Sequence, residues 1–219
     1  MSTVQPPVPG TAQQHAVDSL RRLIVSGALV PGQRVNQEDV AEAIGLSVAP
    51  VREALRVLEQ EGQVTYLPRR GYFVTELRLA DLREIYELRA MLEARAARHA
   101  LPWIDDDALG RIGDAARECV DAAAAGDVAA ELAANRRFHL AILEAPGQPH
   151  TLRVIRLLWD STEAYRAMYY NSPDERAASI EAHDRILAAV RARDADRLVA
   201  ELDAHRGRAL EVLEEVLTP

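Results

Sequence analysis

The sequence predicts a mainly α-helical protein in which an N-terminal winged helix-turn-helix is followed by an all-helical antiparallel bundle of about six helices. Two observations give this fold class. Before residue 77, helical patterns joined by a short glycine-containing turn precede two short β-rich runs, the order of a winged helix-turn-helix. After residue 76, apolar residues recur only at helical spacing between breaks at proline, glycine or aspartate.

These patterns divide the chain into three segments. Residues 1–10 are proline-rich without apolar periodicity, so we expect a disordered lead-in. Residues 11–76 form the predicted winged helix-turn-helix domain, and residues 77–219 form the predicted helical domain. With 219 residues and 48% hydrophobic content, the chain can bury a core in each domain.

Composition limits the class of protein. No run of about 18 apolar residues is present to span a bilayer, and the first ten residues lack the basic and apolar character of a signal peptide. We therefore expect a cytoplasmic protein with no membrane partner. The single cysteine, Cys119, excludes an intramolecular disulfide and a multi-cysteine zinc site.

The net charge argues against an unaided nucleic-acid contact. It is −8 overall, of which residues 1–77 carry −1 and residues 78–219 carry −7. DNA binding would therefore need a local arginine patch in the N-terminal part, helped by dimerisation.

The N-terminal elements follow from spacing and caps. Asn36 and Ser47 are expected N-caps of the second and third helices, and the turn from Pro68 to Gly71 is expected to join the strands as a hairpin. The predicted elements are helices over residues 13–26, 37–44 and 48–61 and strands over residues 63–67 and 72–75.

The third helix is the candidate for the major groove. Its inward stripe contains Val51, Leu55 and Leu58, whereas Arg52 and Arg56 lie one turn apart on the opposite face, a geometry suited to guanine edges and phosphates. Periodicity alone leaves open that these arginines are an ordinary solvated helix face.

Specific residues favour DNA binding. Gly45-Leu46-Ser47-Val48-Ala49-Pro50-Val51-Arg52-Glu53-Ala54-Leu55, followed by Glu61-Gly62 and Arg70-Gly71, resembles the GntR family of bacterial regulators over residues 13–75. The resemblance implies a homodimer on double-stranded operator DNA. The predicted DNA-contacting residues are Ser47, Val48, Ala49, Arg52, Arg56, Arg69, Arg70 and Gly71. The family usually has arginine directly after the capping serine, whereas this chain has Val48, which can contact a thymine methyl instead.

Four polar residues interrupt apolar stripes in the helical domain. Asn135 and His139 share one stripe, while His183 and His205 lie on two others. All four can therefore face one bundle interior. Buried imidazoles need partners, and either hydrogen-bonded packing or a shared divalent metal would supply them.

A second resemblance favours the metal. Asn135-Arg136-Arg137-Phe138-His139, Glu181-Ala182-His183 and His205 resemble the FCD ligand domain of the FadR branch of GntR regulators over residues 78–219. The resemblance implies that Asn135, His139, His183 and His205 bind a divalent ion, with zinc or nickel expected, whose open positions accept a small carboxylate effector. Asn135 replaces the commoner aspartate, which removes a negative ligand.

Arg89 is a further polar residue on an apolar stripe. It is a candidate for binding the effector carboxylate, because a cavity arginine can hold a carboxylate through two parallel hydrogen bonds. The alternative is an ordinary ion pair with Glu93, one helical turn further on.

Two other functions compete with a metal-dependent regulator. His183-Asp184, with His139 before it and Asp203 after it, imitates the order of ligands in helical HD-type metallo-phosphohydrolases. That enzyme would leave the winged helix unexplained. The other alternative is a metal-free helical module, either a bare dimerisation domain or a sensor of an organic ligand.

Overall fold

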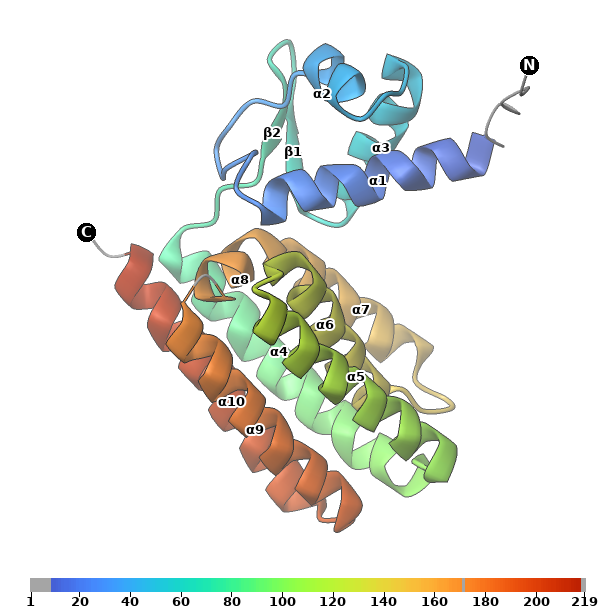
Figure 1. Ribbon diagram of the computed structural model, residues 1–219, viewed down its shortest axis with the longest axis vertical. Coiled ribbons are helices and arrows are strands. Elements are labelled where there is room, and N and C mark those ends of the chain that lie inside the picture. Colours follow the sequence, from blue (N-terminus) through green and yellow to red (C-terminus); the bar gives the residue numbers. More distant parts are fainter. Residues whose placement is uncertain (1–8, 171, 218–219) are drawn as a thin grey trace. The chain divides into compact units, whose positions relative to one another are not determined.

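The computed structural model describes residues 9–170 and 172–217. The chain divides into two compact units between Glu76 and Leu77, and Figure 1 shows the elements of each. The predicted lead-in over residues 1–8 lies outside the described residues. The prediction of a disordered lead-in is corrected at residues 9 and 10, because helix α1 (Pro9–Val25) begins four residues before the predicted helix start. Pro9 is tolerated there because the amides of a first helical turn lack intrahelical partners.

The first unit is the predicted winged helix-turn-helix. After α1 come α2 (Gln37–Ala43), α3 (Val48–Gln60), β1 (Val64–Leu67) and β2 (Gly71–Val74). The strands pair antiparallel, and an isolated bridge joins Arg34 to Phe73 of β2. Helices α1 and α3 pack together over Leu20, Leu55 and Leu58, which are fully buried.

The two predicted helix caps differ. Asn36 accepts a hydrogen bond from the Glu38 amide at 3.1 Å, as expected of an N-cap. Ser47 has the extended backbone of an N-cap but makes no side-chain capping bond. Its exposed hydroxyl is therefore not occupied at the start of α3.

The hairpin turn places an arginine in an unusual conformation. Leu67 pairs with Gly71, and the amide of Arg70 donates to the Leu67 carbonyl at 3.0 Å. Within this turn Arg69 has a φ of 64° and Gly71 a φ of 94°. The sequence predicted the glycine; the left-handed arginine costs about 1 kcal/mol and was not predicted.

The second unit is a helical bundle. Its helices are α4 (Leu79–Ala100), α5 (Asp106–Ala125), α6 (Val128–Leu143), α7 (Pro149–Ser161), α8 (Glu163–Tyr170), α9 (Pro173–Arg191) and α10 (Ala195–Leu217). A short 3-10 turn (Leu101–Trp103) follows α4. Helix α4 packs against α10 and α7, and α5 packs against α6 and α9, around a core that includes Phe138, Ile142, Ile155, Trp159 and Ile186.

The prediction of about six helices omitted one break. Seven α-helices occur in the described part of this unit, because the chain leaves the helix at Thr162, between α7 and α8. The Thr162 hydroxyl donates to the carbonyls of Leu158 and Trp159 at 3.3 Å, and such side-chain to backbone bonds compete with helix continuation. Neither proline nor glycine marks this break.

Among the described helices none has the length and apolar character needed to cross a bilayer.

Candidate functional site

Helix α3 presents a polar face to solvent. Its inner side chains Val51, Leu55 and Leu58 are fully buried, whereas Arg52 and Arg56 are exposed. The Nε of Arg52 donates to Gln37 of α2 at 3.3 Å, which orients the guanidinium.

The other predicted DNA-contacting residues at the start of α3 differ in how exposed they are. Ser47 and Ala49 are exposed beside the first turn, and Val48, which was placed on the outer face, is half-buried. The outer face therefore offers two arginines and a small surface at Ala49, with only part of Val48 accessible.

The wing carries more positive charge than the sequence indicated. Arg69, Arg70 and Arg34 are exposed and, with Phe73, line a surface groove of about 370 Å³. The guanidinium carbon of Arg70 lies 5.2 Å from the centre of the Phe73 ring. Arg34 was missed because the bridge to Phe73 brings it to the wing from 39 residues away. We define Arg34, Arg69 and Arg70 as the wing arginine cluster.

In the helical unit, the three predicted histidines converge from three helices. His139 comes from α6, His183 from α9 and His205 from α10. Each offers a ring nitrogen, and these atoms lie within 4.8 Å of one another. The ring centres are 5.1 to 5.3 Å apart. We call these residues the histidine triad.

Burial leaves the triad short of partners. His139 and His183 are each 3% exposed. Within the part of the chain that the structure describes, neither ring nitrogen of His139 has a hydrogen-bond partner, nor has Nδ1 of His183. Unsatisfied buried polar atoms of this kind indicate a missing partner.

Electrostatics keep the triad neutral. Burial is the main cause that lowers the pKa of His139 and of His183 well below the ordinary value, and the neighbouring His205 adds to it. Burial, followed by the charge of Arg89, lowers the pKa of His205 to about 4. Neutral imidazoles are the form that binds a metal, so this arrangement fits a divalent ion.

Asn135 lies beside the triad and already has a partner. Its Oδ1 is 3.0 Å from Nε2 of His183. The amide oxygen can accept from His183 only while that nitrogen carries a proton. If Nε2 bound a metal, the amide oxygen would lose this bond and become available as a weak fourth ligand.

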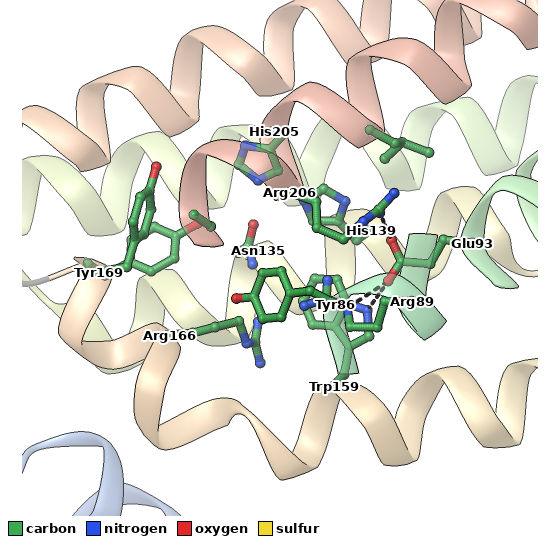
Figure 2. A pocket seen from close by; sticks show the side chains of 13 residues that line it. Tyr86, Arg89, Glu93, Asn135, His139, Trp159, Arg166, Tyr169, His205 and Arg206 are labelled. Carbon is green, nitrogen blue, oxygen red and sulfur yellow. Dashed lines mark hydrogen bonds and ion pairs between the residues drawn. The ribbon is translucent and has the colours of Figure 1, made fainter. Parts of the chain in front are cut away.

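His139 and His205 of the triad, together with Asn135, line a small cavity whose free volume is about 30 Å³. Figure 2 shows the lining side chains, including Tyr86, Arg89, Trp159 and Arg166. Arg89 does line the cavity, but its Nε donates to Glu93 at 2.9 Å, the ion pair that the sequence left open.

Glu93 is the centre of a buried network. Its Oε1 also accepts from Trp159 Nε1 at 2.8 Å, and its Oε2 accepts from Arg206 at 2.6 Å. Burial would raise the pKa of this carboxyl, but Arg89 and Arg206 hold it below the ordinary value. The carboxylate is therefore charged and fixes two guanidinium groups.

Both parts of the chain match protein-family models. The model described as "Bacterial regulatory proteins, gntR family" matches residues 12–74, and the FCD domain model matches residues 84–208. The chain belongs to the GntR family of bacterial regulators and carries a C-terminal FCD domain.

Relatives of this GntR regulator cover most of its length. YdhC of Bacillus subtilis, described as an uncharacterised HTH-type transcriptional regulator, is 26% identical over 91% of this chain and 90% of its own. McbR of Escherichia coli is 29% identical over 85% and 89%. The solved structure of E. coli McbR/YncC matches with a TM-score of 0.81 and 26% identity, covering 94% of this chain and 98% of that one.

The GntR and FCD assignments decide between the broad alternatives. The protein is a DNA-binding transcriptional regulator with an effector-binding FCD domain, and its relatives are regulators rather than enzymes. The HD-type alternative also lacks its carboxylates, because Asp184 and Asp203 are exposed. Neither belongs to the metal-competent cluster, which among the described residues is the histidine triad, and Asp203 pairs with Arg206.

Sequence reasoning missed three cavity residues. Arg166 lies on α8, the helix whose start was not predicted. Arg206 follows His205 directly, and Tyr86 precedes Arg89 by three residues on the α4 stripe. The stripe positions were the available signal for Tyr86 and Arg206; no periodic signal singled out Arg166.

Proposed function

We propose that this regulator is a homodimer that binds operator DNA through α3 and the wing arginine cluster, and that a divalent metal in the FCD domain holds a small carboxylate effector that controls DNA affinity. The observation that carries the metal proposal is the histidine triad, three imidazoles with ligand atoms within 4.8 Å. Nitrogen ligands suit zinc and nickel, and three protein nitrogens leave a position open for an effector oxygen.

The DNA part depends on the exposed arginines of the first unit. Arg52 lies on the outer face of α3 with its Nε held by Gln37, which suits a bidentate contact to a guanine edge. The wing arginine cluster suits phosphate contacts, which add affinity without sequence information. A homodimer would double both sets and read two half-sites.

Elemental analysis tests the metal site. Protein purified without nickel resin should contain about one equivalent of metal, or acquire it from zinc or nickel salts. His139→Ala, His183→Ala and His205→Ala should each lose it and abolish the effector response, with basal DNA binding retained. His150→Ala, an exposed histidine outside the triad, is the control and should keep the metal. A parent protein that takes up no metal refutes this part.

Operator binding tests the DNA interface. Arg52→Ala should weaken specific binding by about 1–3 kcal/mol per subunit, and Arg70→Ala should weaken all DNA sequences more evenly. Arg153→Ala, an exposed arginine of the helical unit, should change neither. Unchanged operator specificity in Arg52→Ala would contradict the proposed docking, and a monomer at micromolar concentration by sedimentation would contradict the dimer.

A further inference from the structure

Arg166 is a buried cation without a hydrogen-bond partner among the described residues. It is 4% exposed, and all three of its guanidinium nitrogens lack a hydrogen-bond partner in the described structure. Figure 2 shows the contrast within one cavity, because dashed lines reach the carboxylate of Glu93 from Arg89 and Arg206, whereas none reaches Arg166.

The groups around Arg166 in the described structure compensate its charge only in part. Glu163, one turn earlier on α8, acts on Arg166 only through its charge, and the positive charges of Arg89 and Arg136 oppose that effect. The guanidinium carbon of Arg166 lies 4.3 Å from the centre of the Trp159 ring, but a π contact replaces only part of the lost hydration. A buried, unpaired charge is strongly unfavourable.

A second unpartnered group lines the same cavity. The hydroxyl of Tyr86, on α4, is buried and has no hydrogen-bond partner in the described structure. Two donors without acceptors in one cavity indicate that an acceptor, rather than another cation, belongs there.

The triad and Arg166 are close enough for one short molecule. The His139 ring lies 5.2 Å from the Trp159 ring, and Trp159 is also the ring that Arg166 contacts. With a divalent ion at the triad, the cavity would hold two cationic centres without an anionic partner, the metal and Arg166.

We propose that the effector of the FCD domain is a short dianion, with one carboxylate at the histidine triad and a second anionic group bound by Arg166 and the Tyr86 hydroxyl. This inference rests on the proposed effector function and specifies its ligand. Arg89 and Arg206 are occupied by Glu93, so Arg166 is the guanidinium available to form parallel bonds to a carboxylate.

The cavity also limits the length of the molecule. Its free volume of about 30 Å³ is that of one or two waters. A groove of about 210 Å³ between α4 and α10 shares Tyr86 and Arg206 with it. Tyr86 lines both spaces. A dianion would therefore have to shift the Tyr86 ring toward the groove while its hydroxyl stays within reach of the second anionic group, and the small cavity favours three or four carbons over a longer chain.

Ligand-free stability tests the unpaired charge. Arg166→Met keeps an unbranched side chain against Trp159 and removes the buried charge, so the urea midpoint of the full-length protein should rise. Arg206→Met is the matched control and should lower the midpoint, because it leaves Glu93 with one cation fewer. A fall in Arg166→Met as large as that in Arg206→Met would show that Arg166 is a structural pair member and would overturn the proposal.

Ligand binding tests the dianion directly. Calorimetry on metal-loaded protein should show malonate or succinate binding more tightly than acetate or propionate, and adipate binding weakly because it is too long. Arg166→Met should weaken the short dianions by roughly tenfold to a hundredfold and the monoanions little. Arg166→Lys, which keeps the charge but not the planar group, should fall between them.

The outcomes separate this inference from the proposed function. Metal uptake with equal affinity for monoanions and dianions, or with no binding of any of these acids, would leave the metal site standing and overturn the dianion. Dianion binding that depends on Arg166 but not on metal would support the second anchor and refute the metal-held first one.

Discussion

Glu93→Gln tests whether the buried network holds the FCD domain together. The carboxylate is 1% exposed and is the shared acceptor of Arg89, Trp159 and Arg206. Glutamine has the same shape and keeps one oxygen acceptor, but it removes the only negative charge among these groups. Arg89 would then be buried without its carboxylate partner, and Arg206 would keep only Asp203, which is exposed.

The magnitude follows from burial. Removing one member of a buried, hydrogen-bonded ion pair costs about 3–5 kcal/mol, which is a large part of the roughly 5–15 kcal/mol that stabilises a typical domain. We therefore expect a loss of at least about 3 kcal/mol. Truncating an exposed ion pair costs only about 0–1 kcal/mol, so Glu118→Gln, which breaks the surface pair with Arg137, is the matched control.

Urea unfolding of the metal-free protein at several pH values measures this effect. Because Arg89 and Arg206 hold the Glu93 pKa below its ordinary value of 4.5, the carboxylate stabilises the fold fully above that pH. Its contribution is lost as the pH falls through the lower value of the folded state. The difference between parent and variant should thus be complete at pH 7 and shrink below pH 4.5. A loss at pH 7 no larger than that of Glu118→Gln would refute the reasoning.

Three further changes have defined outcomes. Arg69→Gly should raise the stability of the winged unit by about 1 kcal/mol, because glycine adopts the φ of 64° without strain. The same change should weaken DNA binding and reduce its salt dependence, and an unchanged salt slope would argue against a phosphate contact. Burial raises the pKa of Glu131 to about 7, so the parent should lose stability as the pH rises from 4.5 through 7. Glu131→Gln should therefore be more stable than the parent at pH 8 but not at pH 4, and equal pH profiles in urea unfolding would contradict this. Asn135→Asp should tighten metal binding in competition with a chelating dye, since a carboxylate adds a charge to the ligand set, and unaltered affinity would place residue 135 outside that set.

The winged helix-turn-helix was predictable because its signals are local. The caps, the inward stripe of α3 and the β-rich runs each depend on neighbouring residues, and the observed boundaries differ from the predicted ones by a few residues at most. Local signals predicted Arg69 and Arg70 but not the third member of the wing arginine cluster, because Arg34 reaches the wing through a bridge to Phe73. The left-handed Arg69 was also hidden, since glycine two residues later gave the expected turn signal.

The cavity was predictable only where polar residues interrupt apolar stripes. Such interruptions identified the histidine triad, Asn135 and Arg89. The structure brings all of these except His183 to the lining of one cavity, and His183 contacts that group through His139, His205 and Asn135. Arg166 escaped because the break at Thr162 places it on a helix of only eight residues, too short for a periodic stripe. Whether a buried arginine has a partner depends on packing between helices, which periodicity does not describe.

Helix α8 offers a physical route from the effector cavity toward the start of the helical unit. The hydroxyl of Tyr165, adjacent to Arg166, accepts from the Leu77 amide at 2.7 Å, and Leu77 is the first residue of that unit after the DNA-binding unit. A ligand that draws Arg166 toward the triad would act on the same short helix that holds Leu77.

Tyr165→Phe should therefore leave metal binding, malonate binding and basal DNA binding intact but reduce the change in DNA affinity that malonate causes. Fluorescence anisotropy with labelled operator measures both affinities, with and without malonate. An undiminished response in Tyr165→Phe would show that the coupling does not depend on this hydrogen bond.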